Sequence, residues 1–192
     1  MKICIFGSAS RKISEEFKKA TYELAGALAR RGHSLVFGAG NDGLMGASAR
    51  GFRDNNGKIL GVIPRFFEED ELEGIYQDCD HLIYTATMAE RKMLMEDNAD
   101  AFIIVPGGIG TLEEFFEVLT LKQLHRHNKA IALYNVDGFF NSIDALIKDY
   151  VYHKFINTNC LDLYKVIDTE EDIINYLENY TSDGIKWDTL KK

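Results

Sequence analysis

Short apolar runs alternate along the chain with longer segments whose apolar residues recur every three to four positions. The short runs are almost wholly apolar, which is typical of strands buried on both faces. We expect such strands at residues 3–6, 35–37, 59–63, 81–84, 101–105 and 130–134, with a weaker one at 164–167. The periodic segments predict helices over about 14–31, after the glycines at 38–43, from about 88, from the glycines at 107–110 to about 125, after 138 and over about 170–180.

The order of these elements predicts a Rossmann-like α/β fold, a doubly wound parallel sheet with helices on both faces. Such sheets bind ligands beyond the carboxyl ends of their strands, and the glycine-rich turns of this chain lie at such ends. The chain has 192 residues and 2 prolines, and no stretch resembles a linker, so residues 1–192 are expected to form a single domain. We expect a loop or short helix in the acidic stretch 65–74 and a peripheral position for the last dozen residues.

Charge and cysteine content narrow the classes of function. A formal net charge of −8 disfavours a broad nucleic-acid surface, which needs a basic face. The 3 cysteines form no CxxC pair, which suits a reduced, cytoplasmic location. The sequence shows no secretory signal and no apolar run of membrane-spanning length. We therefore expect neither a membrane nor a nucleic acid as a partner.

The strongest local signal is at residues 105–114, which read VPGGIGTLEE. A buried strand runs there into three glycines and then into a helix. Gly107, Gly108 and Gly110 let backbone amides approach an anion, and the helix start adds free N–H groups and the positive end of its dipole. A phosphate is the expected ligand. The alternative is a structural turn whose helix is capped by Thr111 and Glu114, which have the spacing of a capping box.

A second possible capping box, Thr87 with Glu90, is followed directly by two cations, Arg91 and Lys92. Two cations near the amino terminus of a helix oppose its dipole, and an anion in front of them would resolve this conflict. On a helix, Met88 shares one face with both cations. The alternative is that Arg91 and Lys92 are solvated surface residues.

The remaining motifs are less informative about function. Residues 38–43 (GAGNDG) fit the GxGxxG pattern, but they follow the second strand instead of the first, and no acidic residue ends the next strand. We interpret them as a structural turn or part of a shared nucleotide crevice, and we disfavour an NAD-dependent oxidoreductase. His125 and His127 diverge on a helix, and residues 79–81 (CDH) alternate faces on a strand, so no metal site is expected. Ser8, at the tip of the first strand, suits either a substrate contact or a turn.

Together these segments resemble the LOG ("Lonely Guy") family. Residues 106–114 (PGGIGTLEE) match the PGGxGTxxE motif of the family, and residues 88–92 (MAERK) resemble its MHxRK motif at the right distance upstream. Residues 43–46 (GLMG) and 6–8 (FGS) match two further elements, and the resemblance extends to about residue 150. The sequence departs from the family pattern at Thr87, where plant members have aspartate, at Ala89, where the motif has histidine, at Ala9, where a serine is usual, and at Ala39, within a usual triple glycine.

The resemblance implies a cytokinin riboside 5′-monophosphate phosphoribohydrolase, which splits a purine nucleotide into free base and ribose 5-phosphate. Family members are homodimers or larger and use neither a metal nor an organic cofactor, and many have been labelled lysine decarboxylases. Carried over by motif, Arg91 and Glu114 are the expected catalytic pair. The expected substrate-binding residues are these two with Ser8, Met88, Lys92, Gly107, Gly108, Gly110, Thr111 and, on the inward side of the same helix, Thr120.

The chemistry gives Glu114 a defined role. Cleavage of an N-glycosidic bond builds positive charge on the ribose, and a nearby carboxylate can stabilise that charge and activate water. Glu114 lies one helical turn past the glycines, within reach of the ribose. Arg91 either holds the phosphate or assists the departing base. The alternative function is a nucleotide-binding or cofactor-carrier protein of the same fold, which has no need for a carboxylate beside the ribose.

Overall fold

The computed structural model describes residues 1–69, 74–185, 187 and 190. Its centre is a parallel sheet in the order β4-β3-β2-β1-β5-β6-β7. The strands are β1 (Lys2–Phe6), β2 (Ser34–Phe37), β3 (Lys58–Pro64), β4 (His81–Thr85), β5 (Ala101–Ile104), β6 (Ala130–Tyr134) and β7 (Lys165–Ile167). Strands β1, β2, β5 and β6 are buried along almost their whole length, which explains why their sequences are apolar rather than alternating.

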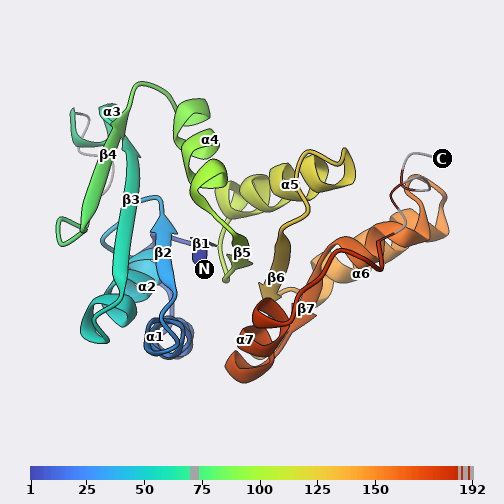
Figure 1. Ribbon diagram of the computed structural model, residues 1–192, viewed down its shortest axis with the longest axis horizontal. Helices are drawn as coiled ribbons and strands as arrows, with labels where there is room; N and C mark the ends of the chain where they lie inside the picture. The colour runs from blue at the N-terminus through green and yellow to red at the C-terminus, as the bar shows by residue number, and fades with distance from the viewer. Residues whose placement is uncertain (70–73, 186, 188–189, 191–192) are drawn as a thin grey trace.

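Helices cover both faces of the sheet (Figure 1). On one face, α1, α2 and α7 bury side chains such as Leu24, Phe52 and Ile173 in a common core. On the other face, α4, α5 and α6 contribute Met95, Phe115 and others to a second core. The α-helices are α1 (Glu15–Arg30), α2 (Gly43–Asp54), α3 (Phe66–Glu69), α4 (Met88–Asn98), α5 (Ile109–Gln123), α6 (Asn141–Tyr152) and α7 (Glu170–Glu178), with 3-10 turns at η1 (Val136–Gly138) and η2 (Thr158–Leu163).

The doubly wound sheet expected from the sequence is confirmed, and each expected strand agrees with the structure to within one residue at either end. Within the acidic stretch 65–74, residues Phe66–Glu69 form the short helix α3, and residues 70–73 lie outside the described residues. Among the described residues, no helix is long and apolar enough to span a membrane.

The carboxyl-terminal segment is more integrated than expected. Ile185 and Leu190 are buried with Cys160 and Leu163 in a small third core. The indole ring of Trp187 stacks on the imidazole of His125, with 4.2 Å between ring centroids. The expectation of a peripheral tail was therefore wrong for these residues, because widely spaced apolar side chains in a polar segment still cover η2 and the end of α5.

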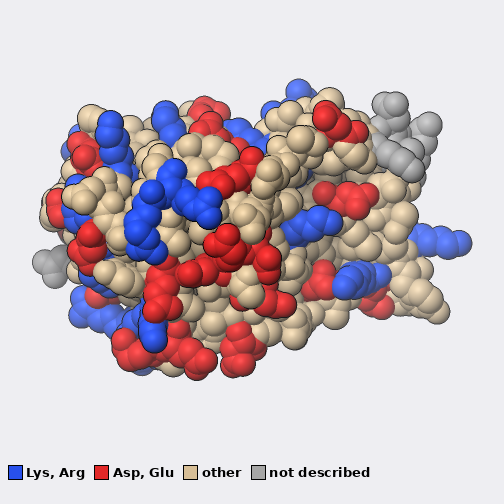
Figure 2. All heavy atoms as spheres, turned by 60° about the horizontal axis from the view of Figure 1, so that its bottom comes forward, with Lys and Arg blue, Asp and Glu red and all other residues tan. Residues whose placement is uncertain are grey.

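The surface agrees with the acidic composition. Figure 2 shows the side of the molecule that carries α1 and α7, where acidic side chains gather and lysine and arginine side chains are interspersed. The first turns of these helices carry Glu15, Glu16, Glu170, Glu171 and Asp172, which the helix dipole stabilises. Helix starts thus account for part of the acidic character of these two helices.

Candidate functional site

The winding of the sheet reverses between β1 and β5. From β1 the chain builds outward to β4, and it then returns to place β5 on the other side of β1. Parallel sheets bind ligands outside the carboxyl ends of the strands at such a switch point. Here the amide of Ser8 donates to the Pro106 carbonyl at 3.3 Å, and the Ser8 carbonyl accepts from the amide of Leu44 at 2.7 Å. The loops after β1 and β5 and the start of α2 therefore meet at this point.

The glycine loop presents the free amides of a long helix. Helix α5 has Gly108 as its N-cap and begins at Ile109. Among the described residues, none accepts a hydrogen bond from the amides of Ile109, Gly110 or Thr111. Gly108, Ile109 and Gly110 are exposed, so these donors face solvent at the positive end of the helix dipole. This is the arrangement that binds phosphate groups.

The structure excludes a capping box formed by Thr111 and Glu114. Helix α5 begins two residues before Thr111, so Thr111 is its third residue, and no side chain caps the helix. Thr111 is buried against Gly107 instead, where a methyl group on Gly107 would overlap the threonine hydroxyl. Glu114 is the sixth residue of α5, beyond the positions that a cap can use. Helix capping therefore does not account for this carboxylate.

Glu114 is a half-buried carboxylate without a bonding partner. No hydrogen bond or ion pair joins it to any residue that the structure describes. Burial raises its pKa from 4.5 to about 7, although the positive charges of Arg91 and Lys92 oppose this shift. The carboxylate thus changes its charge near neutral pH, which is the range that suits a catalytic base.

Arg91 of α4 is almost fully buried, at 5% exposure. Its Nε donates to the Val62 carbonyl and its Nη2 to the Gly38 carbonyl, both at 3.2 Å. Its Nη1 lies 3.7 Å from the sulfur of Met88. The charges of Arg91 and Glu114 both act on the buried thiol of Cys4 in β1, whose pKa burial raises well above its usual value. The expected catalytic pair therefore lies on the same face of the sheet, between α4 and α5.

Lys92 joins α4 to α5. Its ammonium pairs with the carboxylates of Glu113 and Glu117, the latter at 2.8 Å. Partial burial would lower its pKa, but these two carboxylates outweigh that effect and raise it to about 12. Both cations near the start of α4 thus have partners within the chain, and the dipole conflict does not require an anion in front of them.

The capping box at the start of α4 is confirmed. The Thr87 hydroxyl accepts a hydrogen bond from the Glu90 amide at 3.1 Å. In return, the Glu90 carboxylate accepts one from the Ala86 amide at 2.8 Å, one residue earlier than in the usual motif. This cap fixes the helix turn that carries Met88 and Arg91.

The remaining expected residues differ in their position relative to the glycine loop and Arg91. Ser8 adjoins the glycine loop, and the partly exposed Met88 contacts Arg91. Thr120 is exposed and lies six residues beyond Glu114, about 9 Å further along the helix axis. Its side chain does not pack into the core, and its contact with the nucleotide stays a prediction. Hydrogen bonds and electrostatic contacts link Ser8 to the glycine loop, Met88 to Arg91, and Arg91 to Glu114.

Sequence reasoning missed three groups around Arg91. They are the carbonyls of Gly38 and Val62 and the ring of Phe67, whose centroid lies 5.7 Å from the guanidinium carbon. Every residue has a backbone carbonyl, so the sequence cannot indicate which of them will bind Arg91. Phe67 lies in the acidic stretch 65–74, whose apolar residues follow no helix or strand period. Gly38 did stand out as part of the GxGxxG pattern, although its role was not evident.

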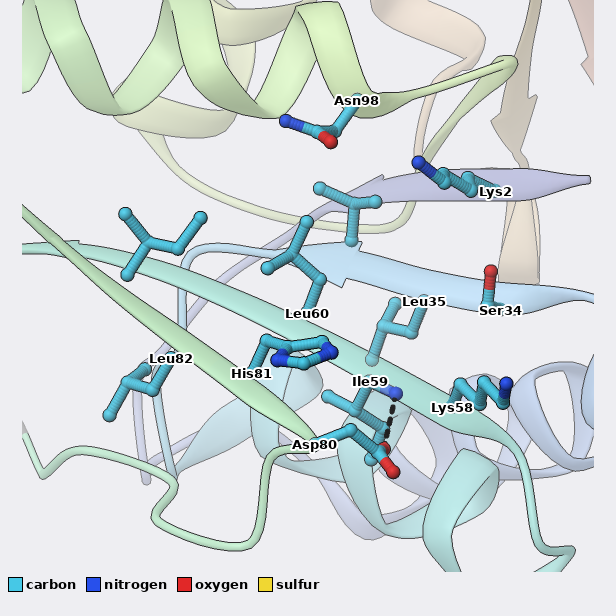
Figure 3. Close-up of a pocket in the computed structure, with 12 residues that line it drawn as sticks. Lys2, Ser34, Leu35, Lys58, Ile59, Leu60, Asp80, His81, Leu82 and Asn98 are labelled. Atoms are coloured by element: carbon cyan, nitrogen blue, oxygen red, sulfur yellow. Dashed lines mark hydrogen bonds between the residues drawn. The ribbon is translucent and has the colours of Figure 1, made fainter.

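A cavity of about 680 Å³ lies elsewhere, at the amino ends of the strands. Figure 3 shows it between the first residues of β1 to β4, including Lys2, Lys58 and His81, and Asn98 at the end of α4. Ligands of parallel sheets bind at the opposite edge, so this cavity is not part of the candidate site. Within the described part of the chain, no group of three or more His, Cys, Asp or Glu side chains is placed to hold a metal ion.

The chain is similar to known proteins along most of its length. A family model described as "Possible lysine decarboxylase" matches residues 45–177. The chain is 36% identical over 180 residues to cytokinin riboside 5'-monophosphate phosphoribohydrolase LOG4 of Arabidopsis thaliana. The aligned region covers 94% of this chain and 83% of that protein. The chain is 34% identical over 194 residues to the probable phosphoribohydrolase LOGL3 of Oryza sativa subsp. japonica, with 98% and 91% covered.

Solved structures agree on the fold. The molybdenum cofactor carrier protein MCP from Chlamydomonas reinhardtii superposes with a TM-score of 0.70 and 19% identity, covering 92% of this chain and 95% of that one. At this identity the likeness extends to the fold alone. The sequence matches are stronger and extend over nearly the whole chain. This chain belongs to the LOG family, whose family model carries the lysine decarboxylase description.

Proposed function

We propose that this protein hydrolyses the N-glycosidic bond of a purine nucleoside 5′-monophosphate, of the AMP or cytokinin type, and releases the free base and ribose 5-phosphate. The observation that carries the proposal is Glu114, a carboxylate with no partner in the described structure and with a pKa raised to about 7. It lies beside a helix start whose amides are free to bind phosphate. The names of the relatives support a LOG-type activity.

The proposed mechanism divides the nucleotide between two sets of groups. The amides of Ile109, Gly110 and Thr111 hold the 5′-phosphate at the start of α5. As the bond between C1′ and the base breaks, its electron pair leaves with the base and positive charge develops on the ribose. The ionised Glu114 stabilises this charge and accepts a proton from the attacking water. The hydroxide adds to C1′, and the base and Glu114 then exchange protons with solvent, so that one water is consumed.

A carrier function is the alternative, because the chain shares its fold with a molybdenum cofactor carrier protein. A carrier needs the glycine loop but not an unpaired carboxylate beside it. Burial of such a carboxylate costs free energy, and nothing in a carrier would offset that cost. Glu114 therefore favours the hydrolase.

Three further properties belong to the proposal: the family resemblance supports a homodimer and the lack of a cofactor, and the cysteine content supports a cytoplasmic location. We propose that the protein acts as a homodimer in the cytoplasm. We also propose that hydrolysis needs neither a metal nor an organic cofactor, since the mechanism above uses amides, a carboxylate and water.

The test is incubation with AMP and with N6-isopentenyl AMP, followed by assay for ribose 5-phosphate. Adenosine is the control, because it has the same glycosidic bond but no phosphate. We expect release from at least one nucleotide, and calorimetry should show far tighter binding of AMP than of adenosine. Absence of ribose 5-phosphate with both nucleotides would contradict the hydrolase, and equal affinity for AMP and adenosine would contradict the phosphate site.

A further inference from the structure

The turn after β2 has a role that the proposed function does not yet include. Gly38 has no positive φ angle, so its backbone does not itself demand glycine. A methyl group at this position would overlap the Nη2 atom of Arg91 and lie 2.7 Å from its Cζ. Contact with a side chain from α4 therefore accounts for Gly38, the first glycine of the GxGxxG pattern, without a phosphate.

Arg91 is fixed in place on several sides. Two carbonyls accept from its Nε and Nη2, and the Phe67 ring lies 5.7 Å from its Cζ, within the range of a cation–π contact. A guanidinium has five N–H donors. Three of them have a partner here if the weak contact with the Met88 sulfur is included. In the described part of the chain, the other two have no acceptor, although Arg91 is only 5% exposed.

The position of Arg91 decides which part of a nucleotide these donors can reach. The carbonyls of Gly38 and Val62 lie at the ends of β2 and β3, whereas the glycine loop follows β5. The sheet order β3-β2-β1-β5 places two to three strand spacings between them, which is about 10 Å or more. A phosphate on the glycine loop lies on the β5 side of β1, whereas the two carbonyls that hold Arg91 belong to the β2 and β3 side. Arg91 is therefore held toward the end of a bound nucleotide that is remote from its phosphate.

We propose that Gly38 and Phe67 are positioning residues that hold the Arg91 guanidinium at the base end of the nucleotide, where its free N–H groups bind the departing base. This inference rests on the proposed hydrolase function. When the C1′–N bond breaks, the electron pair remains on the base, and the fixed cation stabilises that negative charge through hydrogen bonds. Arginine keeps its own protons, so the proton that the base finally takes comes from solvent.

The variant Gly38→Ala tests the inference because its methyl group displaces the guanidinium while Arg91 remains in the chain. Gly184→Ala is the matched control, since a methyl group there meets no atom within 4 Å. Phe67→Leu removes the aromatic ring without adding bulk, and Phe67→Tyr keeps it. The Phe67 pair keeps the inference testable if Gly38→Ala fails to fold.

We expect Gly38→Ala and Phe67→Leu to lower kcat for AMP by ~10-fold or more, because a misplaced catalytic group loses most of its effect. Both should weaken the binding of free adenine and leave the binding of ribose 5-phosphate unchanged. The pH at which activity rises should also move upward, since the Arg91 charge lowers the pKa of Glu114. Phe67→Tyr should retain most of kcat, and Gly184→Ala should match the wild type.

Three outcomes would overturn the inference. They are wild-type kcat in a folded Gly38→Ala protein, equal losses in the two Phe67 variants, and weakened ribose 5-phosphate binding with intact adenine binding. The last result would assign Arg91 to the phosphate. A wild-type protein that releases no ribose 5-phosphate would instead reject the proposed function, and adenine binding would still report whether Gly38 positions Arg91.

Discussion

Glu114 and Arg91 show how burial produces opposite results in neighbouring residues. Arg91 is buried with two carbonyl acceptors, which hold its charge in a fixed place and leave some of its N–H groups free. Glu114 is partly buried without a partner, so burial raises its pKa to about 7. The first residue is a fixed positive charge, and the second is a titratable group near neutral pH. This difference assigns electrostatic stabilisation to Arg91 and proton transfer to Glu114.

Glu114→Gln separates catalysis from binding. Because the carboxylate is the active form and its pKa is raised to about 7, wild-type kcat/KM should rise with pH to a half-maximum near pH 7. The variant should lose this rise, and turnover should fall by ~10² or more, since glutamine neither carries the charge nor accepts a proton. AMP binding should stay near normal. Near-normal turnover in a folded variant would contradict the catalytic role and favour a carrier.

Lys122 provides a test of stability against pH. Its side chain is fully buried, and its Nζ donates to the Leu163 carbonyl at 2.7 Å and lies 4.8 Å from the centroid of the Tyr180 ring. Burial lowers its pKa from 10.5 to about 7. Between these two values the unfolded state binds more protons than the folded state, so stability rises with pH, by at most about 1.4 kcal/mol per pH unit.

The measurement is urea unfolding of the wild type and of Lys122→Met at pH 7 and pH 9. The wild type should gain stability over this interval relative to the variant, because methionine has no proton to lose. A parallel pH dependence in both proteins would show that the buried amine keeps an ordinary pKa. The slope with pH is the relevant quantity, since the variant also leaves the Leu163 carbonyl without its partner.

At the scale of elements, α4 is held by its cap as well as by its apolar face. Met95 is buried in the second core, and the first turn of the helix carries the reciprocal hydrogen bonds of Thr87 and Glu90. Lys92 then ties α4 to α5 through Glu113 and Glu117. Polar contacts thus add to apolar packing in holding the helix that carries Arg91.

Thr87→Ala should lower the free energy of unfolding by about 1 kcal/mol, because it leaves the Glu90 amide without its acceptor. Thr87→Ser is the control, since serine can accept the same hydrogen bond. Denaturant unfolding of both variants measures the difference. Equal stability of the alanine and serine variants would mean that the cap contributes nothing in the folded protein.

At the scale of the whole molecule, the prediction concerns the oligomeric state. The family resemblance leads us to expect a homodimer. Multi-angle light scattering at micromolar concentration should give twice the 21.8 kDa mass of the chain. A monomer under these conditions would contradict this proposal without affecting the arrangement of groups at the switch point. A mass that depends on protein concentration would indicate a weak dimer.

Local patterns in the sequence determined the sheet, its helices and the glycine loop. Buried parallel strands are almost wholly apolar, helices repeat every 3.6 residues, and a helix start after glycines offers free amides to an anion. These signals need only neighbours in the chain. The motif match added Arg91 and Glu114 as a pair, and the contact it implies for Thr120, which is exposed in the structure, stays a prediction.

The tertiary structure alone decided what surrounds these residues. Arg91 bonds to carbonyls 29 and 53 positions earlier, and Lys122 bonds to one 41 positions later. Residues so far apart in the sequence come into contact only when the helices have packed on the sheet, so no local sequence pattern predicts these contacts. The pKa of Glu114 and the steric need for Gly38 both follow from that packing. The sequence determined which groups are available, and the packed fold decided which of them meet, because burial and contact are properties of the assembled chain.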